Sequence, residues 1–540
     1  MKKNFILLST FAALMVSAIL LTACGDEVQM PEKDSTEPEI STETTASTIF
    51  STGVDGTRTK MDANRQFYWT NGDQIYVNTE GAKYKKTTSS TLYENDKKAN
   101  FVLEGVKLIA EKCSVMYIGN GMASTQTTAD ASKLKVKIEA EQRQTAWDNS
   151  DHIGPSGDCG VAEATRDETT GKYSFKLQHK AAYLIFQPYK DAQITANWKL
   201  IKIEIISNNR TNLTGTYDFG TGELVGTGSS NTIKINCNST IDFNNVATGG
   251  FDLSDQASAA NSCFAVIAPG NHKLTIRYTV QPEGSMNDVA GATFTIDKEI
   301  PAVNADGSRT YNPNGVTTIK HKLDVMLFNL QYYQWDALNP YGSPTGTDFN
   351  TIEYPRNTSQ LTTNRAQNSC KDMPNVNEMY GYERGATCFD ETTPWALDGG
   401  SKVYTGGMWV MKKQVILDEG IPFRDDIGKD DVDMRLVFRY SYGPFPTGVL
   451  PAAERSKYFF LPAMGYYDSE GWPYEEITSE NSWLVNRGQY GCYWTSSPCP
   501  GYDSDGVDAA AYSLQFSAGN IQVSEGRRHF YGIVAPELFQ

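Results

Sequence analysis

Histidine is scarce in this chain, with five residues in 540, and no two of them lie close together in the sequence. No Cys-x-x-Cys pair occurs among the nine cysteines. Zinc sites place such ligands at short, regular spacings, so the sequence has no zinc-binding pattern. His179 falls within an alternating strand pattern and is expected to be a core or edge histidine with a hydrogen-bond partner. We therefore expect neither a metal nor a cofactor.

Nucleotide-binding and catalytic motifs are also missing. The sequence has no G-x-x-x-x-G-K-[ST], and no G-x-G-x-x-G opens a helix after a strand. The Gly154–Gly157 stretch lacks the spacing of a nucleophile elbow. A glycosidase-type pair of carboxylates is a property of the fold, so the sequence does not exclude one. Our expectation is a protein that is not an enzyme.

Basic residues are fewer than acidic ones, 48 against 64, and the formal net charge is -16. Nucleic acids and anionic headgroups require a basic patch, which argues against both as partners. Long amphipathic helical periodicity is also hard to find. Tyrosine and glycine are plentiful, at 29 and 45 residues. This composition predicts a mainly β surface protein with many turns.

The N-terminal segment has the form of an export signal. A short basic start is followed by an almost continuously apolar run, Phe5–Leu21, and then by Leu21-Thr22-Ala23-Cys24. The apolar run is too short for a permanent span, which needs about 20 residues. The Leu-Thr-Ala-Cys sequence resembles a lipobox, which implies cleavage after residue 23 and lipidation of Cys24. The alternative is a plain secretory signal with an incidental cysteine.

Residues 24–47 are rich in Glu, Ser, Thr and Pro and contain almost no large apolar side chains. Such a segment cannot bury a core, so it predicts a disordered tether. Asp26-Glu27, beside the proposed anchor, resembles the acidic export signals of Bacteroides-type lipoproteins. This resemblance implies an outer-membrane, cell-surface protein held by its lipid.

Folded structure is expected from Thr48 onward. Asn71-Gly72 separates Gln66–Trp69 from Gln74–Val77, which predicts a hairpin between these two runs. The stretch Tyr173–Phe186 alternates at first and then becomes continuously apolar, as expected for a strand that enters a core. Short strands of this kind continue to about residue 330.

Four motifs occur in order along this region. They are Arg58-Thr59 followed by Trp69-x-x-Gly72-Asp73-x-Ile75-x-Val77, then Gln142-x-Gln144-Thr145, then Leu177-x-His179-x-Ala181-Ala182-x-Leu184-x-Phe186, and Lys202–Ser207 leading to Leu213-x-Gly215-x-Tyr217-x-Phe219. Together they resemble the fimbrillin (Mfa-like) surface lipoproteins of Bacteroides-type bacteria. The resemblance implies two transthyretin-like β-sandwich domains in series, at residues 48–195 and 196–330.

The same resemblance implies a mode of assembly. Polymerising fimbrillins exchange strands between subunits after cleavage behind a basic residue in the N-terminal region, which opens an acceptor groove. Arg58, Lys60 and Arg65 lie in about the right place, and the sequence does not choose among them.

Residues 331–540 differ from the preceding region, being dense in Trp, Tyr, Gly and Pro. Asn375, with Glu378 three residues later, predicts a helix N-terminus. The motifs near the end are Phe460–Tyr466, Gly491-x-Tyr493-Trp494-Thr495-Ser496-Ser497, Ala511–Phe516, Gly519–Ile521 and Arg527–Val534. They resemble the FISUMP-type extracellular domain, which is similar to C-type-lectin and formylglycine-generating-enzyme folds. The resemblance implies an α+β, C-type-lectin-like domain over residues 331–540.

Aromatic residues of this last region are candidates for ligand stacking. Trp494 lies in a segment expected to be a core strand. Trp472 and Trp483 lie in a stretch rich in Gly and Ser, and we expect them to be exposed and available for stacking on sugars. Cys492 and Cys499 invite comparison with the formylglycine enzymes but match no motif of theirs, so a disulfide or two inert thiols is favoured. The Asp503–Asp508 stretch is favoured as an acidic surface loop over a Ca²⁺ site.

These features together predict a lipid-anchored adhesin or a fimbrial tip or accessory subunit. The last 210 or so residues occupy the end from which a donor strand usually comes, which argues against a shaft subunit. The expected partners are the outer membrane, other fimbrillin subunits, and host or dietary glycans or surface proteins. The alternative is a stand-alone carbohydrate-binding surface lipoprotein without a fimbria.

Overall fold

The fold is known from a computed structural model of the chain and is mainly β, as predicted. The structure describes residues 46–52, 60–81, 83–123, 128–341, 366–442, 447–451, 453–469, 482–500, 510–528, 531–535 and 538–539. The predictions for Cys24, Arg58, Trp472 and Asp503–Asp508 lie outside these residues. No helix in the described ranges is both long and apolar enough to cross a membrane.

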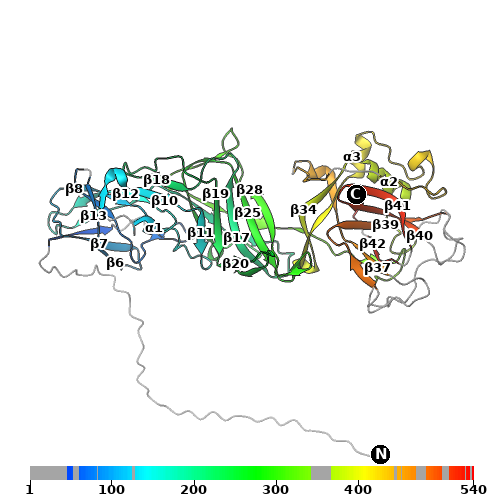
Figure 1. Cartoon of the computed structure of the whole chain (residues 1–540), viewed down its shortest axis with the longest axis horizontal. Helices are drawn as coiled ribbons and strands as arrows, with labels where there is room; N and C mark the ends of the chain where they lie inside the picture. The colour runs from blue at the N-terminus through cyan, green and yellow to red at the C-terminus, as the bar shows by residue number, and fades with distance from the viewer. Residues whose placement is uncertain are drawn as a thin grey trace, which may run out of the picture.

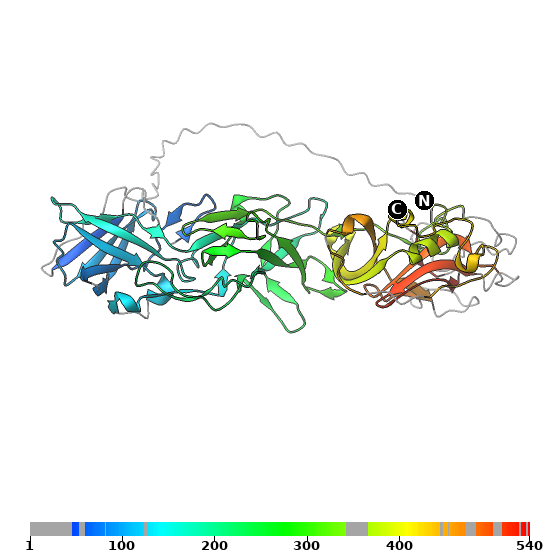
Figure 2. The ribbon, with the colours of Figure 1, turned by 90° about the horizontal axis from the view of Figure 1, so that it is seen from above.

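The strands form three groups that follow one another along the long axis of the molecule (Figure 1, Figure 2). A ten-stranded sheet stands at the end that holds the first strands of the chain. In sheet order its strands are β6 (Ser89–Tyr93), β7 (Lys98–Glu104), β1 (Ser47–Thr52), β13 (Tyr173–Phe175), β12 (Gly160–Arg166), β8 (Lys112–Tyr117), β4 (Tyr76–Glu80), β5 (Lys83–Lys86) and β9 (Thr128–Asp130), with β14 (Gln178–His179) beside β12. Short helix α1 (Asn120–Ala123) follows β8.

The predicted hairpin around Asn71-Gly72 is half right. The turn forms, with Gly72 at a φ of 89° and the Asp73 amide donating to the Thr70 carbonyl over 3.1 Å. The strands on either side do not pair with each other, however. The strand before the turn, β3 (Phe67–Tyr68), pairs with β2 (Lys60–Met61), whereas β4 after it pairs with β5 and β8. Turn chemistry is local, whereas strand partners are decided by distant parts of the chain.

The middle group is built around a long strand, β17 (Trp198–Ser207). Its sheet runs β11 (Glu141–Gln144), β19 (Thr232–Cys237), β17, β25 (Leu274–Pro282) and β28 (Phe294–Glu299), with β22 (Phe251–Asp252) also on β17. The apolar alternation of β17 changes phase at Leu200-Ile201, and the pairing with β25 shifts register between Leu200 and Lys202. A bulge therefore keeps the apolar side chains on the core face.

A second sheet of the middle group is covered on both faces. It is formed by β23 (Cys263–Ile267), β15 (Ala182–Phe186) and β30 (Val316–Ile319). In β15 the side chains of residues 182, 184 and 186 join one core and those of 183 and 185 join another. A strand with two buried faces needs an unbroken apolar run, which explains the end of the Tyr173–Phe186 pattern.

In the described ranges the C-terminal group contains two large sheets, a short pair of strands formed by β37 (Tyr466–Ser469) and β38 (Ser482–Val485), and two α-helices. One sheet runs β33 (Tyr332–Tyr333), β42 (Ile533–Val534), β39 (Tyr490–Pro498), β40 (Ala510–Ser517) and β41 (Asn520–Arg528). The other runs β27 (Val289–Ala290), β26 (Ser285–Met286), β35 (Lys402–Met411), β34 (Thr387–Leu397) and β32 (Met326–Leu327), with β36 (Tyr458–Pro462) on β35. The helices are α2 (Val376–Arg384) and α3 (Lys413–Asp418).

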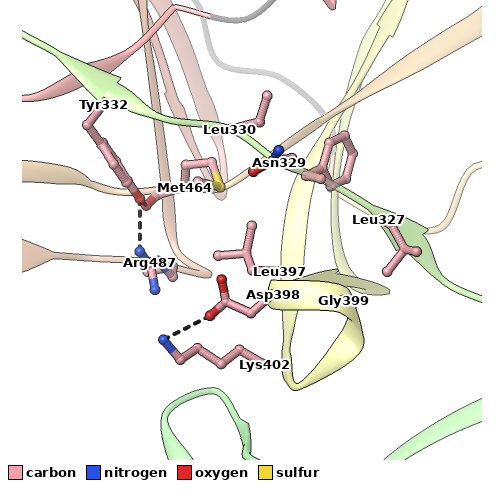
Figure 3. A pocket seen from close by; sticks show the side chains of 11 residues that line it. Leu327, Asn329, Leu330, Tyr332, Leu397, Asp398, Gly399, Lys402, Met464 and Arg487 are labelled. Carbon is pink, nitrogen blue, oxygen red and sulfur yellow. Dashed lines mark hydrogen bonds and ion pairs between the residues drawn. The ribbon is translucent and has the colours of Figure 1, made fainter. Parts of the chain in front are cut away.

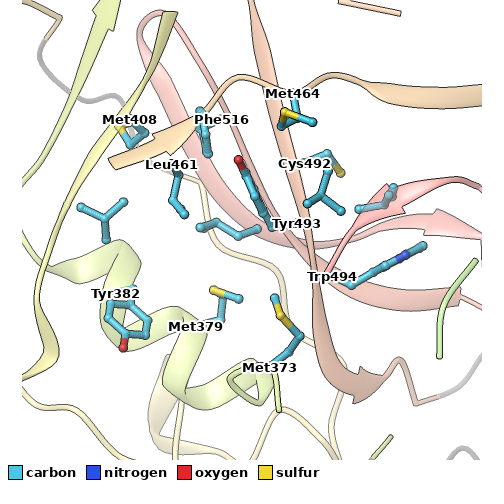
Figure 4. Packing of buried hydrophobic residues seen from close by; sticks show 14 of the residues in the cluster. Met373, Met379, Tyr382, Met408, Leu461, Met464, Cys492, Tyr493, Trp494 and Phe516 are labelled. Carbon is cyan, nitrogen blue, oxygen red and sulfur yellow. The ribbon is translucent and has the colours of Figure 1, made fainter. Parts of the chain in front are cut away.

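Helix α2 begins as the sequence predicts. The Asn375 side chain accepts from the amides of Asn377 and Glu378, and the Glu378 side chain accepts from the Asn375 amide. This reciprocal capping box satisfies amides that the first helical turn leaves unpaired. Figure 4 shows Met379 and Tyr382 of α2 facing the core that contains Tyr493 of β39. The cap thus sets where α2 begins to cover the C-terminal core.

A small hairpin joins the middle group to the C-terminal group. Strands β26 and β27 leave the middle group, and β26 adds in parallel to the edge of β35, pairing Ser285 with Lys402. Across the same junction the Trp198 indole donates to the Gly400 carbonyl over 2.8 Å. The β26–β35 pairing and this hydrogen bond join the two groups, and no local pattern in the sequence predicts either contact.

Gly400 offers a test of this junction. Its φ is 92°, and a Cβ placed there would lie 2.6 Å from Cγ2 of Ile194. We expect Gly400→Ala to lower the free energy of unfolding by about 2–3 kcal/mol, measured by urea titration. The matched control is Gly420→Ala, since Gly420 has a φ of 74° but open space around it. A loss of the same size in both variants would contradict close packing at the junction.

Candidate functional site

Strand β1 occupies an interior position of the first sheet. It pairs antiparallel with β7 and parallel with β13, and Phe50 lies opposite both Phe101 and Tyr173. The Phe50 side chain is fully buried and stacks on the Tyr173 ring at 4.9 Å between centroids. The position between β7 and β13, called the β1 slot below, is therefore occupied by the first strand of the described chain.

Polar side chains reinforce the seating of β1. The Thr48 hydroxyl donates to the Val106 carbonyl over 2.8 Å and accepts from the Leu108 amide over 3.0 Å. The Thr52 hydroxyl accepts from the Ala99 amide over 3.0 Å. Phe50 and the two threonines share the buried face of the strand. The β1 slot therefore holds an alternating segment with a threonine on either side of a phenylalanine on its buried face.

The predicted cleavage candidates follow this strand. Lys60 lies in β2, is partly exposed, and forms an ion pair with Asp151 at 2.8 Å. Arg65 is exposed, has a φ of 66°, and donates from Nη2 to the Thr318 hydroxyl over 3.4 Å. Both side chains are accessible at the surface. Cleavage at either, or at Arg58, stays a prediction.

The tryptophans predicted to stack on sugars are placed only in part. Trp483 belongs to β38 (Ser482–Val485), and its backbone lies opposite Asp468 of β37 (Tyr466–Ser469). The core prediction for Trp494 is confirmed, since its side chain is fully buried and its indole donates to the Tyr333 carbonyl over 2.8 Å. A stacking role for Trp472 and Trp483 stays a prediction.

The histidine and cysteine predictions also have structural outcomes. His179 is buried, as predicted, and its Nδ1 lies 2.7 Å from a carboxylate oxygen of the buried Asp158. Cys492 and Cys499 are both fully buried, which opposes a role as reactive thiols. Within the described ranges, no three His, Cys, Asp or Glu side chains are grouped so that they could hold a metal ion.

Glu383, on α2, is a buried carboxyl group that the sequence did not single out. It accepts hydrogen bonds from the Ser441 hydroxyl and from the Val523 amide, the latter over 3.0 Å. Burial raises the pKa of Glu383 from 4.5 to about 7. The protonated form is therefore favoured in the folded chain relative to the unfolded one.

This raised pKa makes a prediction for stability. Between about pH 4.5 and 7 the folded chain binds more protons at Glu383, so stability falls as pH rises through that window. The total loss is about 3 kcal/mol above pH 7. We expect Glu383→Gln to abolish this loss and to be more stable than the original chain at pH 8. Urea titrations at pH 4 and pH 8 would test it, with the exposed Glu419→Gln as the control that keeps the pH dependence.

A second site lies in the C-terminal group around Arg487. Its Nη1 donates to the Tyr404 hydroxyl over 2.9 Å and its Nη2 donates to the Tyr332 hydroxyl over 3.2 Å. Those phenols donate onward, Tyr404 to Asp288 over 2.6 Å and Tyr332 to the Met464 carbonyl over 2.6 Å. The guanidinium is thus fixed by neutral oxygens drawn from separate parts of the chain.

Arg487 lines two hollows in the surface. One has a volume of about 520 Å³ and is bordered by Asn329, Asp398 and Lys402, as Figure 3 shows. The other, of about 580 Å³, is bordered by polar side chains that include Glu391. Asp398 and Lys402 neutralise each other through an ion pair at 3.0 Å. The charge that remains at the first hollow is that of Arg487.

The sequence gives no signal for this site. Tyr332 belongs to an aromatic-rich run of the sequence, Tyr404 to a strand, and Arg487 to a polar turn. The three side chains are brought together by β33, β35 and the turn before β39. A site assembled from one residue per segment leaves no local motif.

Comparisons with known proteins give a likeness of fold over about half the chain. No family model and no curated protein matches. A candidate cell adhesion protein of Bacteroides ovatus is similar over 51% of this chain and 91% of its own, at 16% identity and a TM-score of 0.30. A fimbrial assembly protein of Parabacteroides distasonis is similar over 52% and 92%, at 11% identity and a TM-score of 0.25. A C-terminally truncated tip fimbrial protein, Mfa3 of Porphyromonas gingivalis, is similar over 52% and 95%, at 12% identity and a TM-score of 0.25. Scores this low assign no function to this chain.

Proposed function

We propose that this chain is a lipid-anchored cell-surface adhesin, or a fimbrial tip or accessory subunit, without catalytic activity. The observation that carries the proposal is the order of the three strand groups along the long axis of the molecule. The sheet that contains β1, the first strand after the proposed tether, stands at one end, and the C-terminal group stands at the other (Figure 1). A tether at the β1 end leaves the C-terminal group free to reach a target.

The position of β42, the last strand that the structure describes, supports a tip or accessory subunit over a shaft subunit. Strand β42 lies between β33 and β39, with Ile533 and Val534 fully buried. A donor strand must leave its own subunit to complete a neighbour's sheet. A C-terminal strand that is part of its own core does not meet this requirement.

A stand-alone carbohydrate-binding lipoprotein is the second candidate. The observation that favours it is the pair of hollows at Arg487, which lie in the C-terminal group and offer polar groups to a small ligand. Both candidates place the binding surface in the C-terminal group, and they differ in whether the chain joins a fimbria.

Surface labelling tests the proposal. Antibodies against residues 331–540 are expected to bind intact cells that make the chain. The Cys24→Ser variant is expected to leave the membrane fraction, because it lacks the acylated thiol. Labelling that requires permeabilised cells would contradict a surface adhesin. Membrane retention of the variant would contradict anchoring at Cys24.

A further inference from the structure

We propose that the hollow at Arg487 binds a sugar residue that carries a carboxylate, such as a uronic or sialic acid. This inference extends the proposed function by assigning a ligand class to the C-terminal group. It rests on the contacts of Arg487, on the polar groups beside it, and on the size of the hollow.

The first argument is that the Arg487 guanidinium has unused N–H donors and no acidic partner among the described residues. A guanidinium has five N–H donors, and two of those on Arg487 are used by Tyr404 and Tyr332. Its Nε is buried, so a ligand in the hollow would meet the two terminal nitrogens, each of which keeps one N–H beyond its bond to a tyrosine. Among the residues that the structure describes, Arg487 forms no ion pair with a carboxylate. A partly buried cation without a counter-ion costs free energy. Such a group is suited to an anionic ligand.

The second argument is that Arg487 is oriented in advance. The Tyr404 ring lies 5.1 Å and the Tyr332 ring 6.0 Å from the guanidinium carbon, so both rings contact the cation as well as bonding to it. Hydrogen bonds from both terminal nitrogens, Nη1 and Nη2, fix the plane of the guanidinium group, whose N–H groups form a planar fork. A fixed planar fork matches the two oxygens of a carboxylate, and little side-chain entropy is left to lose on binding.

The third argument selects a sugar among carboxylates. The hollow of about 520 Å³ falls within the usual range of small-ligand sites. Asn329, Asp398 and Lys402 surround it with both donors and acceptors (Figure 3). Ring hydroxyls both donate and accept, so they suit this mixture, whereas a bare carboxylate would leave these groups unused. Apolar side chains such as Leu397 and Met464 complete the wall and suit the apolar face of a ring.

Saturation-transfer NMR on the purified chain from residue 25 onward would test the proposal. The probes are glucuronate and N-acetylneuraminate, with glucose as the neutral sugar and acetate as the carboxylate without a ring. We expect the acidic sugars to bind at least ~10-fold more tightly than glucose or acetate. If glucose bound as tightly as the acidic sugars, the site would not recognise a carboxylate. If acetate bound as tightly, the site would not recognise a sugar ring.

Variants locate the site. Arg487→Gln is expected to abolish binding of glucuronate, and Arg487→Lys to weaken it because the fork is lost while the charge stays. The control is Arg424→Gln, since Arg424 is an exposed arginine of the same group that pairs with Asp426. Binding that survives Arg487→Gln would overturn the proposal.

A measurement on the unaltered chain avoids any effect of substitution on folding. Phenylglyoxal labelling of Arg487, followed by peptide mass spectrometry, is expected to be slowed by glucuronate and unaffected by glucose. Labelling that glucuronate does not slow would overturn the proposal. Both measurements use purified chain in solution, so their failure would leave the surface-labelling test of the proposed function untouched.

Discussion

Replacing Asp158 by Ala is expected to lower the free energy of unfolding by about 3–5 kcal/mol. Asp158 is fully buried, accepts a hydrogen bond from the Tyr183 hydroxyl, and lies 2.7 Å from Nδ1 of His179. The Phe67 ring stacks on His179, with 4.3 Å between the ring centroids. The variant leaves the Tyr183 hydroxyl and Nδ1 of His179, which lie 3.0 Å apart, with only each other in place of the carboxylate. Urea titration of the variant measures the loss.

Two further variants sharpen this prediction. Asp158→Asn keeps an acceptor oxygen and is expected to lose only about 1–2 kcal/mol. Glu163→Ala removes an exposed carboxylate of the same sheet, which pairs with Lys112 across the surface, and is expected to change stability little. An equally small change in Asp158→Ala would show that the buried contacts do not stabilise the fold.

Replacing Phe50 by Ala is expected to lower the free energy of unfolding by about 3–5 kcal/mol. Phe50 is the one aromatic side chain of β1, is fully buried, and packs on Tyr173 between the neighbouring strands. Loss of the Phe50 ring leaves a cavity between β1 and the strands on either side of it. The chain should also become more sensitive to proteolysis between β1 and β2.

Ile49→Ala is the matched control, because Ile49 lies on the opposite, partly exposed face of the same strand. It keeps every backbone hydrogen bond of β1 and is expected to lose about 1 kcal/mol. Equal losses in the two variants would contradict the seating of β1 through its buried face. Limited trypsin digestion at increasing urea, followed by mass spectrometry, reads out the release of β1 directly.

Local patterns in the sequence predicted local structure. The Asn375 and Glu378 pair predicted the start of α2, and the Gly-x-Tyr-Trp motif predicted the burial of Trp494. Period-two runs predicted the mainly β fold, because consecutive side chains of a strand point to opposite faces and so leave an alternating pattern in the sequence. Even the phase change at Leu200-Ile201 is visible in the sequence, although its cause, a bulge against β25, requires the partner strand.

Pairings between distant segments could not be predicted in the same way. The place of β1 between β7 and β13, and the addition of β26 to β35, join residues about 50 to 120 positions apart and depend on the whole fold. The site at Arg487 needs Tyr332 and Tyr404 beside it, and no spacing in the sequence connects the three. Its distinguishing property, an arginine bonded to two tyrosine hydroxyls and without an acidic partner among the described residues, exists only after folding.

The most direct test of the account is the assembly state of the chain from residue 25 onward, before and after mild trypsin treatment. Light scattering after size exclusion, together with electron microscopy, reads it out. The account predicts single elongated monomers in both samples, because β42, the last strand that the structure describes, is built into its own sheet. Filaments or a ladder of oligomers after cleavage near residues 58–65 would contradict it and make the chain a polymerising shaft subunit.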